Sequence, residues 1–197
     1  MRRGLLPFVL LGVAAAVPAT AEDVSFQYTI ERERGGSIVE DTFLRGFDVT
    51  DGLRFRVKLN QTSYCYVLMS AAGGSYRLVF PDPGTLLGGA LPLNEFARIP
   101  KSTFLRVGED PRVNRIYIIV SARRVPELDE VASKGAAVLN EAKTLEIRNR
   151  YVHADAGYTK ETQGQTVSVK YHGKTGAYSV VEEIDLPPAG SKPAPVK

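Results

Sequence analysis

Alternating hydrophobic and polar residues recur through most of this chain and predict β-strands. The alternation is clearest at 24–30 and 53–59, where every second residue is hydrophobic. Successive side chains of a strand point to opposite faces, so a period of two places one face on a core. Shorter or weaker strands are expected at 37–43, 76–80, 103–107 and 114–121. The pattern therefore predicts a mainly β protein.

Two further runs are hydrophobic on both faces, which is typical of strands buried at the centre of a fold. They are the segments 64–69 and 116–120. The glycines of Ala72-Gly73-Gly74-Ser75 suit a tight turn after the first run. We expect the strands at 53–59, 64–69 and 76–80 to form an antiparallel meander.

A long loop is expected at 81–100, because this segment has no regular period and contains four prolines and three glycines. Loops of this length in a compact domain are usually functional or fold as a lid. The loop is also unusually apolar, and its candidate partner-binding residues are Leu86, Leu87, Leu91 and Phe96. Two interpretations stay open: a surface that binds a partner, and a lid that completes the core.

The period changes to that of a helix after Pro126, and a single α-helix is expected over 126–143. Gly135 would lie inside this helix. The segment Thr144 to Val152 can continue the helix or form a strand. A polar linker is expected at 153–164.

The last regular segments, 167–171 and 178–184, alternate again and are expected to form a C-terminal hairpin. Together these elements predict an antiparallel β-sandwich of immunoglobulin-like style with one packed α-helix. We expect one β-rich domain at 22–186. The helix and the C-terminal hairpin occupy its last part, 126–186.

The first 21 residues have the order of a signal peptide. Arg2 and Arg3 precede an apolar run, and small residues end at Ala21. We expect such a signal peptide to direct the chain to the periplasm or the medium, with cleavage between Ala21 and Glu22. The residue after the cleavage site is not cysteine, so a lipid anchor is not expected. The Pro-rich tail at 187–197 is expected to be disordered.

The charge and the cysteine content narrow the classes of function. The formal net charge is +3, and loss of Arg2 and Arg3 with the signal peptide lowers it to about +1, so a nucleic-acid partner is not expected. No transmembrane segment is expected in the exported chain. Cys65 is the only cysteine, which excludes an intramolecular disulfide.

The segment 53–123 carries motifs of a known family. They are Tyr64-Cys65-Tyr66-Val67-Leu68, Leu78-Val79-Phe80-Pro81, Ile99-Pro100 and Val120-Ser121. With these motifs the segment resembles a bacterial family described as domain of unknown function 4384. The resemblance implies a β-rich exported domain that is often an accessory to other modules and has no assigned activity.

The chain carries no nucleophile elbow, phosphate loop, zinc helix or calcium loop. Its two histidines, His153 and His172, are expected in a polar connector and a turn, without a partner of catalytic spacing. We therefore expect neither enzymatic activity nor a metal or cofactor. A hydrolase with dispersed catalytic residues would need a polar cleft around one histidine.

A basic stripe is the best electrostatic feature of the sequence. Arg54, Arg56 and Lys58 recur on one face of the strand at 53–59. Such a stripe could follow an anionic polymer or an acidic protein surface. The favoured alternative is a solvated outer face that discourages pairing at the sheet edge. Glu182 and Glu183 could pair with it across the sheet.

These observations favour a non-enzymatic binding module that docks a protein partner of the cell envelope through the 81–100 loop and the adjacent sheet edge. The alternative is a module that binds anionic glycan through Arg54, Arg56 and Lys58. A dispersed-site hydrolase is a third hypothesis. The identity of the partner and the oligomeric state stay open.

Overall fold

The structure is a computed structural model that describes residues 24–41, 46–82, 88–106, 114–135, 138–152, 157–172 and 178–186. The expected signal peptide and Pro-rich tail lie outside these residues, as do His153 and most of the turn expected at 172–176.

The first sheet is antiparallel and is built around the longest strand, β1 (Val24–Arg34). Its strand order is β10–β11–β1–β3–β6, with β2 also paired to β1 and β7 to β3. The other bounds are β2 (Ser37–Asp41), β3 (Gly52–Leu59), β6 (Ala97–Ile99), β7 (Leu105–Arg106), β10 (Tyr158–Gln163) and β11 (Thr166–Tyr171). Along one side, β1 pairs first with β11 and then with β2.

The second sheet is also antiparallel and has the order β12–β8–β4–β5–β9. Its bounds are β4 (Tyr64–Ala71), β5 (Ser75–Phe80), β8 (Arg115–Ser121), β9 (Val138–Asn140) and β12 (Ser179–Asp185). A short 3₁₀ turn, η1 (Ala72–Gly74), joins β4 to β5, and Gly73 and Gly74 have positive φ there. This confirms the predicted glycine turn.

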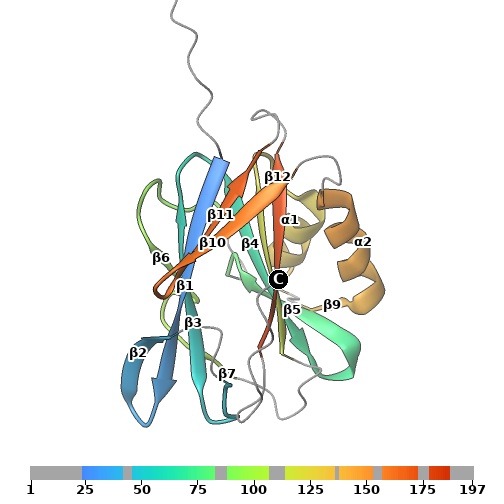
Figure 1. The fold of residues 1–197 in the computed structure, drawn as a ribbon. Coiled ribbons are helices and arrows are strands. Elements are labelled where there is room, and N and C mark those ends of the chain that lie inside the picture. The colour runs from blue at the N-terminus through green and yellow to red at the C-terminus, as the bar shows by residue number, and fades with distance from the viewer. Residues whose placement is uncertain are drawn as a thin grey trace, which may run out of the picture.

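The two sheets pack face to face, and two helices cover the outer face of the second sheet (Figure 1). The helices are α1 (Pro126–Ser133) and α2 (Glu141–Tyr151). One core fills the space between the sheets, and a second core lies between the second sheet and the helices. The predicted mainly β sandwich is confirmed.

The two cores explain the runs that are hydrophobic on both faces. In β4, Cys65 and Val67 face the core between the sheets, while Tyr66 and Leu68 face the helices. Ile118 and Ile119 of β8 divide in the same way. Strands in the middle layer have no solvent-facing side, so their polar positions disappear.

The predicted meander over 53–80 is wrong at its first connection. β3 belongs to the first sheet, whereas β4 and β5 pair in the second. The chain therefore crosses the sandwich between Leu59 and Tyr64. A short polar segment can join two neighbouring strands of one sheet or carry the chain from one sheet to the other. The local sequence pattern therefore does not distinguish a hairpin from a crossing.

The predicted C-terminal hairpin is wrong for the same reason. β11 pairs with β1 and β10, while β12 pairs with β8 in the opposite sheet. The partner of β11 in a hairpin is instead β10, which lies in the segment expected to be a linker. All six residues of β10 are exposed. Because the strand has no buried face, its sequence lacks the alternation of hydrophobic and polar residues that would predict a strand.

The single helix expected over 126–143 is replaced by two. α1 ends at Ser133, and the positive φ of +68° at Gly135 suits a glycine just beyond a helix end. Residues 138–140 then form β9, and α2 begins behind the N-cap Asn140, whose side chain accepts a hydrogen bond from the Lys143 backbone. The segment 144–151 is therefore helical.

Candidate binding face on strands β3 and β6

The basic side chains of β3 lie on the outer face of the first sheet, opposite the core. In the register, Arg54 lies beside Glu31, Arg56 beside Thr29 and Lys58 beside Gln27 on β1. Arg54 is nevertheless buried, with only 8% of its surface exposed, whereas Arg56 and Lys58 are half-buried. The stripe is therefore buried at its Arg54 end and partly accessible to solvent at Arg56 and Lys58.

A buried carboxylate organises this face. Glu31 Oε2 accepts a hydrogen bond of 2.6 Å from Arg54 Nε, and Glu31 Oε1 accepts one of 3.3 Å from Arg98 Nε. Arg56 Nε lies 4.0 Å from the same Oε1. One carboxylate thus faces three guanidinium groups, and it neutralises only one unit of their charge.

Arg98 was not among the sequence-predicted site residues. It lies on β6, directly opposite Arg56 in the register, and its side chain is 57% exposed. Arg98 falls within the segment 81–100, which was expected to be an irregular loop without strands. That expectation is wrong for Ala97–Ile99. A signal was present, because Arg98 stands between hydrophobic residues in strand-like alternation.

Two phenylalanines hold the basic side chains in place. The Arg54 guanidinium lies 4.4 Å from the ring centroid of Phe104, and that of Arg56 lies 4.8 Å from the centroid of Phe96. The Lys58 ammonium lies 5.7 Å from the Phe96 centroid. These cation–π contacts restrict the rotamers of long side chains that would otherwise be mobile in water.

The positive charge of this face exceeds the negative charge. Glu40 of β2 pairs with Arg56, so Glu31 and Glu40 together face Arg54, Arg56 and Arg98. Lys58 adds a further cation, and no carboxylate of the described residues lies within ion-pair distance of it. We call Arg56, Lys58, Phe96 and Arg98 the β3–β6 face.

Residues 88–94 of the expected loop are hydrogen-bonded to both sheets. The Cys65 backbone N–H donates to Gly89 O at 2.7 Å, and the Asn94 N–H donates to Leu59 O at 2.8 Å. Leu91 is half-buried against the core, while Leu93 is 49% exposed. Leu86 and Leu87 lie outside the described residues.

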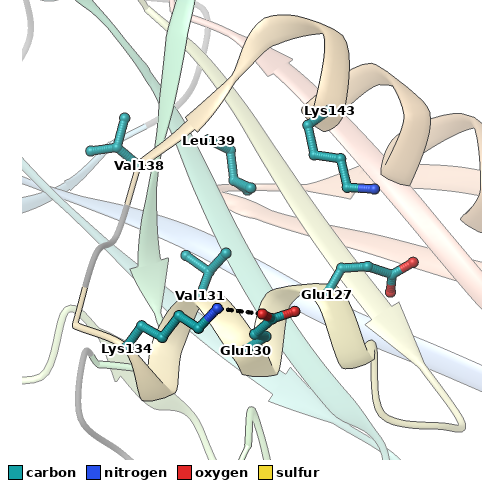
Figure 2. A pocket seen from close by; sticks show the side chains of 7 residues that line it. All are labelled: Glu127, Glu130, Val131, Lys134, Val138, Leu139 and Lys143. Carbon is teal, nitrogen blue, oxygen red and sulfur yellow. Dashed lines mark hydrogen bonds and ion pairs between the residues drawn. The ribbon is translucent and has the colours of Figure 1, made fainter.

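A shallow groove of about 330 Å³ lies between α1 and the β9–α2 segment (Figure 2). Val131, Val138 and Leu139 form its apolar part, and Figure 2 shows the Lys134–Glu130 ion pair at its rim. Lys143, another lining residue, pairs with Glu146. The rim charges near the groove are thus paired within the protein.

The expected pairing of Glu182 and Glu183 with the basic stripe is wrong. β12 belongs to the second sheet, so Glu182 points into the sandwich and accepts hydrogen bonds from Tyr28 and Lys160. Glu183 pairs with Arg115 and Arg148.

The histidine that the structure describes lies on the surface. His172 is exposed, and its Nε2 is 2.9 Å from the Thr159 hydroxyl. Among the described residues, no group of three or more His, Cys, Asp or Glu side chains is arranged to hold a metal ion.

No family model matches the chain, and no match was found among the curated proteins or the solved structures. The resemblance to a bacterial domain family therefore stays a prediction. None of the described helices is long and apolar enough to span a membrane.

Proposed function

We propose that this protein is an exported, non-enzymatic binding module that docks an acidic surface of a cell-envelope protein. The observation that carries the proposal is the excess of positive charge on the β3–β6 face. Arg56 and Arg98 lie directly opposite each other and share one buried carboxylate with Arg54. Like charges in cross-strand positions are unfavourable unless an anion lies between or above them.

The face is also preorganised. Arg56 contacts Glu31, Glu40 and the Phe96 ring, so little side-chain entropy would be lost when it meets a ligand. The backbone beneath it belongs to paired strands rather than to a free loop. Binding sites on regular elements hold their geometry better than sites on loops.

A protein partner is favoured by an exposed apolar residue next to the end of β3. Leu93 is 49% exposed and forms an isolated bridge with Leu59, which follows Lys58 on β3. An acidic protein surface with an apolar side chain would cover Leu93 and the charged face together. Interfaces of this composition, with an aromatic residue and arginines near an apolar contact, are common between proteins.

Anionic glycan is the second candidate, supported by the line of cations along β3 and β6. Its binding set differs from the one expected from sequence, because Arg54 is buried against Glu31 and Phe104. Arg98 takes its place, so a glycan carboxylate or sulfate would contact Arg56, Lys58 and Arg98.

The test compares two double variants that remove the same charge from different surfaces. Lys58→Ser with Arg98→Ser alters the β3–β6 face, and Lys134→Ser with Lys143→Ser alters the helical layer. Binding to an immobilised peptide of alternating glutamate and leucine, and to polygalacturonate, is measured over a range of salt concentrations. We expect the face variant to bind about threefold to thirtyfold more weakly and the helix variant to bind as the parent does.

The effects of the substitutions on binding to the two ligands separate a protein partner from a glycan. Binding that is tighter to the peptide than to polygalacturonate, and that Leu93→Ser weakens further, supports a protein partner. If the face variant loses as much binding to polygalacturonate as to the peptide, and Leu93→Ser has no effect, a glycan is favoured. If the face variant and the helix variant bind alike, the β3–β6 face is not the binding surface.

A further inference from the structure

β2 is an edge strand that presents hydrophobic side chains to solvent. It pairs with β1, and its outer edge is unpaired among the described residues. Ile38 and Val39 are 53% and 52% exposed, on opposite faces of the strand. In Figure 1, β2 lies at the periphery of the first sheet. Exposed apolar edges are templates for pairing with another strand.

The turn before β2 determines which backbone groups face outward. Arg34 and Ser37 flank the two-residue turn Gly35-Gly36, and both glycines have positive φ. Such a turn closes on a hydrogen-bonded pair. Because hydrogen-bonded and non-hydrogen-bonded pairs alternate, the N–H and C=O groups of Ile38 and Glu40 point away from β1. They are available to a further strand.

We propose that β2 pairs antiparallel with β2 of a second copy of this chain, about a two-fold axis normal to the sheet at Val39. In this register Val39 lies opposite Val39 of the second copy, and Ile38 lies opposite Glu40. The outward groups of Ile38 and Glu40 then form four backbone hydrogen bonds across the axis. No like charges are opposed, and both exposed hydrophobic side chains become covered.

The other exposed edge of the first sheet lacks this self-complementarity at its middle. β10 is exposed along its full length and pairs with β11 on one side. A two-fold axis at the middle of β10 would place Lys160 opposite Lys160, or Glu161 opposite Glu161. Directly opposed like charges destabilise such a pair. A pairing centred on the middle of the strand therefore suits β2 and not β10.

The arrangement of the first sheet leaves room for the second copy. β11 pairs with Val24–Tyr28 of β1, and β2 pairs with Ile30–Arg34. β10 lies on the far side of β11, level with the first half of β1 and away from the outer edge of β2. Because the two-fold axis is normal to the sheet, both outer faces point the same way. The dimer would present two β3–β6 faces to one partner surface, which raises avidity.

Sedimentation velocity over a range of concentrations tests the pairing on the chain without its expected signal peptide. We expect a concentration-dependent dimer. Val39→Lys, which opposes two lysines at the axis, should weaken dimerisation at least about tenfold. Thr162→Lys on β10 is the matched control and should leave it unchanged. A monomer at every concentration, or a dimer indifferent to Val39→Lys, would overturn the proposal.

Cysteine cross-linking tests the register. Opposed residues in a non-hydrogen-bonded pair have Cα atoms about 4.5 Å apart, which a disulfide can span. Val39→Cys should therefore form a disulfide-linked dimer on mild oxidation, while Glu40→Cys, which faces Ile38 of the second copy, should not. Cys65 is buried and does not compete. No cross-link through Val39→Cys would overturn the register. These readouts do not involve ligand binding, so their failure is distinct from failure of the proposed function.

Discussion

The Tyr28 hydroxyl donates a 2.6 Å hydrogen bond to Glu182 Oε1 across the interior of the sandwich. Tyr28 belongs to the first sheet and Glu182 to the second, and both are almost fully buried. Lys160, on the edge strand β10, donates to the same oxygen. Burial and the neighbouring Glu182 charge raise the pKa of Tyr28 far above its usual range, so it stays a donor. A polar contact thus joins the two sheets.

Tyr28→Phe should lower the free energy of unfolding by about 1.5–3 kcal/mol, because Glu182 loses a hydrogen bond to its buried carboxylate. Urea unfolding at pH 7 measures the change. Tyr171→Phe is the control, since that hydroxyl makes no hydrogen bond with a described residue, and it should stay within about 0.5 kcal/mol of the parent. Equal effects of the two substitutions would show that Glu182 does not depend on Tyr28.

Asp51 should make the stability fall in acid. Its buried carboxylate accepts hydrogen bonds from Arg34 Nε at 2.6 Å and from the Asp48 N–H at 2.8 Å, and the Arg34 bond is the main cause of its lowered pKa. A folded-state pKa below the unfolded value gives stability at neutral pH that is lost as pH falls through the folded pKa. Loss should begin below about pH 5.

Asp51→Asn should therefore cost about 1.5–3 kcal/mol at pH 7, and the difference from the parent should shrink as pH is lowered toward 3. Urea unfolding across this range is the measurement. Asp185→Asn, at a carboxylate that is 70% exposed, is the control. A difference that is constant with pH would contradict the role given to the Asp51 charge.

Cys65 should be unreactive in the folded protein. It is buried in β4, and burial raises its pKa to about 12, so the thiolate is scarce at pH 8. We expect aromatic disulfide reagents to label it only as fast as the protein unfolds, and at once in urea. Stoichiometric labelling within seconds under native conditions would show that the strand opens easily.

Gly89 should tolerate no side chain. A Cβ at this position would lie 1.8 Å from the carbonyl oxygen of Cys65, so the backbone of the 88–94 segment would have to move. Gly89→Ala should cost about 1–3 kcal/mol in urea unfolding. Gly157→Ala is the control, because a Cβ there meets no atom within 4 Å. A neutral Gly89→Ala would mean that the contact with β4 is dispensable.

The candidate site was only partly predictable. The alternation in β3 placed Arg56 and Lys58 on one outer face, and the structure agrees. Arg98 and Glu31 were missed, because only pairing between distant segments brings β6 and β1 to either side of β3. The burial of Arg54 had no local signal, since Phe104 and Glu31 cover it from elsewhere in the chain.

The sequence by itself determined the mainly β class, most strands and the strands that carry two hydrophobic faces. Those features follow from local periodicity, because each strand must turn its apolar side toward a core. The tertiary structure alone decided which sheet each strand joins, where β10 and β6 pair, and which charges meet. Strand pairing depends on contacts between residues far apart in sequence, and a polar edge strand such as β10 leaves no hydrophobic pattern to announce it.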